Sequence, residues 1–254
     1  MPQIRIAPMV PFSMMKHISK FSDISLYLFH EIENTAYKRI YLSNENYKII
    51  DNGTFELGKL PRDEDYVNIS VNLHPNEIVA PDLLGDFLET KRRTSEFLSK
   101  YYDIINRDGI KLQAVVQAEN LSDAINHYIS ISKDSRIFCI GLPFKMELKD
   151  EEKRVNREQF IEILIDRGIV SSKPHHLLGL NSIHELIRLS KHKFIRSCDS
   201  SIFYRDARDG INYKKGIPNI KSGSRIDLQC KEGKKCLERL KHNLDIVKKE
   251  MLRE

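Results

Sequence analysis

The chain has 254 residues, of which 41% are hydrophobic and 30% are charged, and its formal net charge is +5. This composition supports a packed core and argues against a disordered chain. No apolar run approaches the roughly 20 residues that span a membrane, and the first residues lack the basic-then-apolar pattern of a signal peptide. The four cysteines show no CxxC spacing, so we expect free thiols and a cytoplasmic location.

Short apolar segments recur along the chain and predict buried parallel strands, because they are rich in Val, Ile and Leu and mostly do not alternate. In chain order these segments are 24–29, 47–50, 78–80, 112–116, 137–140, 176–178 and 194–197.

Helical patterns fall between these segments. Residues 88–106 carry apolar side chains at helical spacing near their end, and residues 121–132 form a second pattern. Asn156 can cap a third helix over 157–167, and the Ser-x-x-Glu spacing at 182–185 predicts the start of a fourth. Repeated strand–helix units predict a parallel sheet with helices outside it.

Polar residues or glycine stand where each predicted strand gives way to a loop, at intervals of 20 to 38 residues. In a TIM (β/α)₈ barrel such positions face one shared active site, so we predict a single compact barrel domain over residues 1–254. An open doubly wound sheet is the alternative, and the lack of a glycine-rich phosphate loop disfavours it. The strand-end residues are Asp51, Asp82, Gln117, Gly141, Gly179 and Asp199.

Two of the three carboxylates among these residues have a similar setting. Asp51 and Asp199 each follow a short apolar or mixed run and precede small polar residues. Two carboxylates at strand ends are a common way to combine a nucleophile with a proton-transfer group.

Each motif alone also has a plainer interpretation. Residues 51–53 have the composition of a turn, and Asp82 after Pro81 could cap a helix. Gln117 could be a polar loop residue, and Phe55 and Leu178 could be core. The histidines at 74, 175, 176 and 184 have no acidic or Cys partner at ligand spacing, so we expect surface or core roles for them.

Taken in order, the strand ends resemble those of the tRNA-guanine transglycosylase superfamily, over about residues 49–201. The matching segments are Asp51-Asn52-Gly53-Thr54-Phe55, Val79-Ala80-Pro81-Asp82, Val115-Val116-Gln117, Ile140-Gly141-Leu142, His176-Leu177-Leu178-Gly179-Leu180 and Arg196-Ser197-Cys198-Asp199-Ser200.

The resemblance implies a TIM barrel that exchanges guanine in a nucleic acid for a 7-deazaguanine base. It implies that Asp199 is the nucleophile, which forms a covalent glycosyl intermediate, and that Asp51 is the general acid and base.

The resemblance also implies a purine pocket in which Asp82 accepts hydrogen bonds from the donors of guanine. Gln117 and the backbone N–H of Gly141 or Leu142 would donate to O6, while Phe55 and Leu178 would sandwich the ring. The target base would leave its stack to enter this pocket. The implied substrate-binding set is Asn52, Phe55, Asp82, Gln117, Gly141, Leu142, Leu178 and Gly179.

The chain departs from the tRNA enzymes after Asp199. The Pro-Thr-Arg run of the family is replaced by residues 200–205, and only 55 residues follow Asp199. Cys230 and Cys236 are six apart with His242 nearby, which does not match the zinc motif of the bacterial enzymes. We therefore expect no metal, no cofactor and no C-terminal zinc subdomain.

A compact, zinc-free form resembles the branch of phages and bacterial DNA-modification clusters. DNA and a free 7-deazaguanine of the preQ0 type are thus the expected partners, in the host cytoplasm if a phage encodes the protein. The same reaction on tRNA is an alternative. A non-catalytic nucleic-acid-binding barrel and a glycoside hydrolase are further alternatives, and a homodimer stays open because many relatives dimerise.

The C-terminal region, about residues 205–254, holds fourteen Lys and Arg against eight Asp and Glu, a net charge of +6. Such a segment suits a phosphate backbone, although a solvated helix face is an equal alternative on charge alone. The pattern over 237–251 predicts an amphipathic helix that packs on the barrel. The expected backbone contacts are Arg205, Arg208, Lys214, Lys215, Lys221 and Arg225.

Overall fold

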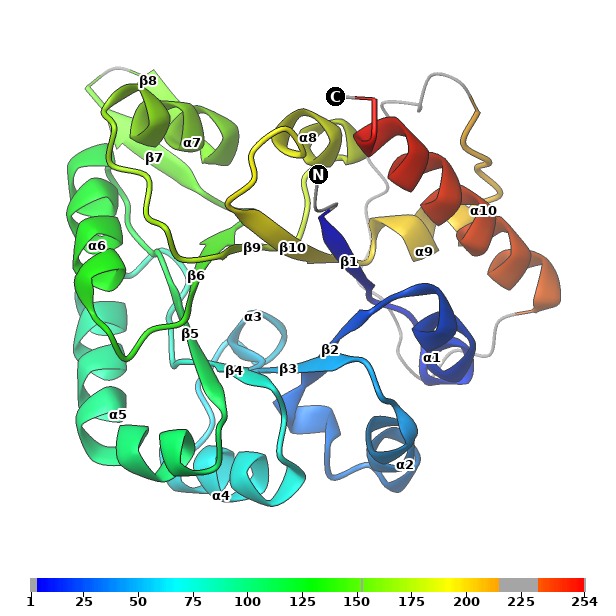
Figure 1. Ribbon diagram of the computed structural model, residues 1–254, viewed down its shortest axis with the longest axis horizontal. Coiled ribbons are helices and arrows are strands. Elements are labelled where there is room, and N and C mark those ends of the chain that lie inside the picture. Colours follow the sequence, from blue (N-terminus) through cyan, green and yellow to red (C-terminus); the bar gives the residue numbers. More distant parts are fainter. Residues whose placement is uncertain (1–3, 152, 215–232, 254) are drawn as a thin grey trace. The chain divides into compact units, whose positions relative to one another are not determined.

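The computed structural model describes residues 4–151, 153–214 and 233–253 (Figure 1). Its main sheet contains eight strands in the order β1-β10-β9-β6-β5-β4-β3-β2, with helices between successive strands of the chain. This arrangement is a TIM (β/α)₈ barrel, so the predicted fold is confirmed.

Apart from the barrel strands, β7 and β8 form a small two-stranded sheet of their own. The strands are β1 (Arg5–Pro8), β2 (Ile24–Leu28), β3 (Tyr47–Asp51), β4 (Glu77–Val79), β5 (Lys111–Val115), β6 (Cys139–Pro143), β7 (Glu147–Asp150), β8 (Lys153–Asn156), β9 (His175–Leu178) and β10 (Ile195–Ser200). The α-helices are α1 (Phe12–Ile18), α2 (Thr35–Ser43), α3 (Thr54–Leu57), α4 (Asp63–Leu73), α5 (Phe87–Arg107), α6 (Leu121–Lys133), α7 (Arg157–Asp166), α8 (Ile183–Leu189), α9 (Ile202–Arg208) and α10 (Lys234–Met251). Two short 3₁₀ turns are η1 (Ser19–Phe21) and η2 (Phe29–Glu31).

All seven predicted strands are present, with ends that differ from the prediction by at most three residues. The sequence interpretation missed β1, which pairs in parallel with β10, and the antiparallel hairpin of β7 and β8. It also placed Gly141 and Asp199 at strand ends, whereas Gly141 lies inside β6 and Asp199 inside β10. Pairing with a neighbouring strand extends both strands beyond their apolar runs.

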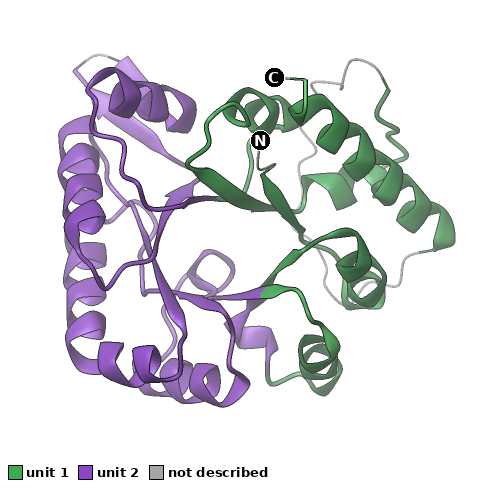
Figure 2. Cartoon of the chain, viewed as in Figure 1, with its two compact units in different colours: residues 1–26, 33–47, 177–254 green, residues 27–32, 48–176 purple. Residues whose placement is uncertain are grey.

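The chain divides into two compact units (Figure 2). Unit 1 comprises residues 1–26, 33–47 and 177–254, and unit 2 comprises residues 27–32 and 48–176. Unit 2 holds β4, β5 and β6 with their helices, and unit 1 holds β1 and β10 with α8, α9 and α10.

The strands of unit 2 have the apolar, fully buried pattern expected of a parallel sheet. Ile78 of β4 lies in register with Leu112 of β5, and Ala114 of β5 with Ile140 of β6. All four side chains are at most 1% exposed. Because neither face of these strands meets water, they show continuous rather than alternating hydrophobicity.

The helix starts that were predicted from capping residues are confirmed. The Asn156 side chain accepts from the N–H of Gln159 at the start of α7, and the two residues form a reciprocal capping box. The Ser182 hydroxyl accepts from the N–H of Glu185 at the start of α8. Each such cap contributes about 1 kcal/mol to helix stability.

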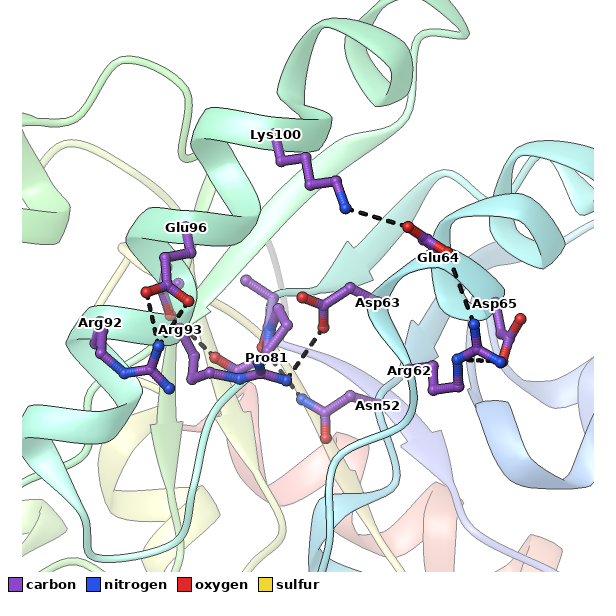
Figure 3. A network of polar contacts seen from close by, with 12 residues as sticks. Asn52, Arg62, Asp63, Glu64, Asp65, Pro81, Arg92, Arg93, Glu96 and Lys100 are labelled. Atoms are coloured by element: carbon purple, nitrogen blue, oxygen red, sulfur yellow. Dashed lines mark hydrogen bonds and ion pairs between the residues drawn. The ribbon is translucent and has the colours of Figure 1, made fainter.

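Helices α4 and α5 of unit 2 are joined by surface ion pairs (Figure 3). Arg93 of α5 lies 3.4 Å from Asp63 of α4, and Lys100 lies 3.2 Å from Glu64. The Lys100–Glu64 pair is exposed, whereas Arg93 and Asp63 are partly buried. Ion pairs that water still reaches stabilise a protein by only about 0–1 kcal/mol each. The buried aromatic contact between Tyr66 of α4 and Phe97 of α5, with ring centroids 6.2 Å apart, therefore contributes more to their association.

Helix α10 packs within unit 1 against α8 and α9. It buries Leu240, Leu244, Val247 and Met251, as the amphipathic pattern predicted, while Leu237 remains partly exposed. Tyr213, just before the undescribed segment, donates its hydroxyl to Asp206 of α9 at 2.5 Å. Among the described residues, no helix combines the length and the apolar character that crossing a membrane requires.

Candidate active site

A single carboxylate joins the loops that follow three neighbouring strands of unit 2. Asp82, after β4, accepts a hydrogen bond at Oδ1 from Asn52 Nδ2, after β3, at 2.8 Å. Its Oδ2 accepts from Gln117 Nε2, after β5, also at 2.8 Å. The orientations of both amides are fixed, because the Asn52 oxygen accepts from the N–H of Thr54 and the Gln117 oxygen accepts from the N–H of Gly85. We name Asn52, Asp82 and Gln117 the carboxylate–amide cluster.

Burial raises the pKa of Asp82 above its usual range, and the hydrogen bonds from Asn52 and Gln117 oppose this shift. The two amides thus favour the ionised carboxylate in a place where burial disfavours it. This cluster also corrects two plainer interpretations. Asp82 does not cap a helix, since Asp86 caps α5, and Gln117 is 4% exposed rather than a solvated loop residue.

Asp51, the last residue of β3, forms the turn that its sequence predicted. Its Oδ2 accepts from the N–H of Gly53 at 3.0 Å. The buried hydroxyl of Tyr66 lies 2.9 Å from the carbonyl oxygen of Ile50, the residue before Asp51, and 2.9 Å from that of Val79. Burial, with the negative charges of Asp51 and Asp82, raises the pKa of Tyr66, so the hydroxyl stays a donor that links the ends of β3 and β4.

His30 lies against this turn, and no sequence motif identified it. It follows β2, and its Nδ1 lies only 2.5 Å from the position that a Cβ on Gly53 would occupy. Gly53 also has a φ of +75°, a conformation that favours glycine. Burial lowers the pKa of His30, and its Nδ1 is buried without a hydrogen-bond partner among the described residues. Close approach of the imidazole therefore explains the glycine at position 53.

The backbone at Gly141 and Leu142 accepts a hydrogen bond from an arginine that no sequence motif identified. Arg157, at the start of α7, is fully buried and donates from Nη1 to the carbonyl oxygen of Leu142 at 2.8 Å. Because a buried guanidinium needs good acceptors, this contact fixes the end of β6. The signal in the sequence was only an Arg beside the Asn156 cap.

Phe55 is exposed at 38%, so it is not a core residue. It lies on α3, four residues after Asp51, and its ring contacts Phe144 edge-on with centroids 5.4 Å apart. The ammonium of Lys145 lies 4.9 Å from the Phe55 centroid. An exposed cation–π contact of this kind contributes about 0.5–1 kcal/mol.

Unit 1 holds the remaining candidate residues. Asp199 of β10 accepts from the N–H of Gly179, after β9, at 3.0 Å. Gly179 has a φ of +66°, and Leu178 at the end of β9 is partly exposed. The structure thus brings Asp199 and Gly179 together within unit 1, as it brings Asn52, Asp82 and Gln117 together within unit 2.

The basic residues that the sequence predicted to contact phosphate differ in burial and in their ion pairs. Arg205 of α9 is partly buried, and burial lowers the pKa of its guanidinium. Arg208 is exposed and donates to Asp209 at 2.8 Å, and Lys214 is exposed. Lys215, Lys221 and Arg225 lie outside the described residues.

A buried histidine supports the carboxylate–amide cluster from α6. His127 Nδ1 lies 3.2 Å from the carbonyl oxygen of Gln117, so this nitrogen carries the proton. The ring also contacts Phe87 edge-on at 5.3 Å. Burial lowers the pKa of His127 to about 4.

Among the described residues, no three His, Cys, Asp or Glu side chains group as metal ligands. Of the two C-terminal cysteines, Cys230 lies outside the described part of the chain, and Cys236 is buried in α10.

No protein-family model matches the chain, and no curated protein matches it. Solved structures do match. A protein from Aquifex aeolicus VF5, determined in a structural study, has a TM-score of 0.57 and 9% identity, over 98% of this chain and 93% of that one. D-psicose 3-epimerase, determined in the presence of D-fructose, has a TM-score of 0.52 and 12% identity, over 98% and 99%. At these identities the likeness shows the fold alone.

The contact between His30 and Gly53 predicts unequal effects at two glycines. Gly58 has a φ of +67° with nothing near its Cβ position, so Gly58→Ala should cost only the roughly 1 kcal/mol of left-handed strain. Gly53→Ala adds a clash with His30, and we expect a loss of about 2–3 kcal/mol in the free energy of unfolding. Denaturant titration measures both. Adding His30→Ala to Gly53→Ala should reduce its loss to that of Gly58→Ala. Equal losses in Gly53→Ala and Gly58→Ala would show that His30 does not restrict position 53.

The buried His127 predicts a pH dependence of stability. Its folded pKa of about 4 lies below the ordinary 6.5, so the unfolded chain binds the additional proton between these values. The free energy of unfolding should therefore rise from pH 4 to pH 6.5, by about 3 kcal/mol from this group. The variant His127→Gln should lack this rise in the free energy of unfolding. The control variant His17→Gln, at an exposed position, should show the same rise as the wild type. Denaturant titrations at pH 4.5, 5.5 and 7 test this, and an unchanged slope in His127→Gln would refute it.

Proposed function

We propose that the protein is a base-exchange transglycosylase that replaces guanine in DNA by a 7-deazaguanine base of the preQ0 type. The carboxylate–amide cluster is the observation that carries this proposal. Guanine presents N1–H and its exocyclic amine as donors on one edge, and an ionised carboxylate offers about four lone pairs. Asn52 and Gln117 use one lone pair on each oxygen of Asp82, so each oxygen keeps one for the base.

The neighbouring groups suit the same ligand. Phe55 provides an exposed aromatic face four residues after Asp51, on which a purine can stack. In TIM-barrel enzymes the catalytic residues lie at or near the carboxyl ends of strands. Asp51 is the last residue of β3, Asp82 follows β4 by three residues, and Asp199 is the last but one residue of β10.

The proposed reaction has two displacements at C1′ of the target nucleotide. In the first, Asp199 attacks C1′, the bond from C1′ to N9 of guanine breaks, and Asp51 gives a proton to the departing base. In the second, Asp51 takes a proton from N9 of the incoming 7-deazaguanine, whose N9 attacks C1′ and displaces Asp199. Two inversions give net retention, as in retaining glycosidases.

The choice of DNA rests on the sequence after Asp199. Residues 200–205 replace the Pro-Thr-Arg run of the tRNA enzymes, and their zinc motif is absent from the sequence.

A base-exchange assay tests the proposed activity. We expect labelled guanine or preQ0 to enter duplex or single-stranded DNA and not tRNA. Incorporation into tRNA alone would show that tRNA is the substrate instead of DNA. A lack of incorporation into every polynucleotide would reject the proposed activity.

Variants of the two carboxylates test the mechanism. Asp199→Asn keeps an oxygen for the N–H of Gly179 but cannot form the glycosyl ester, so both exchange and covalent trapping of DNA should be lost. Asp51→Asn should slow exchange by about 10²–10⁴-fold, the usual contribution of a general acid and base. The exposed control Asp209→Asn should exchange normally. Trapping that persists in Asp199→Asn would assign the nucleophile to another residue.

A further inference from the structure

The loop after β6 places a positive charge on the exposed aromatic side chain of the candidate site. The ammonium of Lys145 lies 4.9 Å from the ring centroid of Phe55 and 5.9 Å from that of Phe144. The two rings contact each other edge-on, at an interplanar angle of 74°. We name Phe55, Phe144 and Lys145 the aromatic–lysine cluster. All three belong to unit 2.

The described residues provide no anionic partner for the ammonium of Lys145. Lys145 is exposed, and among the described residues it contacts ring faces and makes no ion pair. Lys149, four residues further on in β7, differs in this respect because its ammonium lies 3.9 Å from Glu119. An exposed cation–π contact is weak, so Lys145 can leave the ring for an anion.

The position of the cluster defines which anion it suits. Phe55 lies on α3, four residues after Asp51 at the end of β3, and Lys145 follows Leu142 by three residues on the loop after β6. An aromatic face that can stack a base, next to a cation that can meet a phosphate, is the combination that binds unstacked nucleotides.

From this geometry we infer that Lys145 binds a backbone phosphate beside the target nucleotide when a base stacks on Phe55. The inference rests on the proposed function and extends it to the recognition of the polynucleotide. Stacking of the base takes the place of the ammonium on the Phe55 ring, and the released ammonium pairs with the phosphate. Lys145 thereby couples entry of the base to contact with the backbone.

The two substrates of the exchange reaction separate this role from a structural one. Lys145→Ala should raise the KM for the oligonucleotide on the order of fivefold and reduce the slope of log K against log salt by about 0.7–0.9, the loss of one phosphate contact. The KM for the free 7-deazaguanine should not rise, because that base carries no phosphate and no longer has to displace the ammonium from the Phe55 ring. Lys145→Arg should restore the oligonucleotide KM, and the matched control Lys149→Ala should not change it.

The outcomes distinguish failure of the inference from failure of the proposed function. If the wild type exchanges bases and Lys145→Ala keeps its oligonucleotide KM and salt slope, Lys145 does not bind phosphate and the proposed function stands. An equal rise in the KM for the free base would also overturn the inference, since it would indicate a role in shaping the pocket. If the wild type neither binds nor modifies any polynucleotide, both are overturned.

Discussion

The carboxylate of Asp82 holds the candidate site of unit 2 together, because the loops after three neighbouring strands meet on it. Asn52 and Gln117 each donate to one of its oxygens, and Gly85 and Thr54 fix the orientations of the two amides. His127 supports the backbone of Gln117 from the outside. Loss of Asp82 would take away the acceptor of the buried Gln117 amide nitrogen and leave the Asn52 amide nitrogen only the carbonyl oxygen of Ala80. Losing an acceptor for a buried donor is more costly than losing an exposed hydrogen bond.

Two features of these loops lower the stability of the folded protein: the buried charge of Asp82 and the backbone conformation of Gly53. Burial disfavours the ionised form of Asp82, although its amide partners favour it. Gly53 holds a left-handed conformation against the imidazole of His30, a position where no other residue fits without a shift of that ring. Strain and buried charge that the surrounding structure maintains are typical of functional sites. Their occurrence in adjacent loops therefore supports a binding role for this end of unit 2.

Much of the fold was predictable because buried parallel strands appear in the sequence as short, continuous apolar segments. Strand β1 was missed since it is four residues long and ends at Pro8, so only its pairing with β10 defines it. In the site, the sequence indicated that Asp82 and Gln117 end neighbouring strands, but it could not show that amides already occupy both oxygens of Asp82. His30, Lys145 and Arg157 belong to no motif, and their roles arise from contacts with residues distant in the chain.

The proposed function depends on recognition of the donor edge of a guanine-like base by Asp82, which Asn52 and Gln117 hold in place. Calorimetric titration with 7-deazaguanine and with 7-deazahypoxanthine, which lacks the exocyclic amine, tests this most directly. A site with buried acceptors rejects a ligand that lacks the matching donor. We expect the wild type to bind 7-deazaguanine at least about tenfold more tightly, and Asp82→Ala to lose this preference. Equal affinities of the wild type for the two bases would contradict the account.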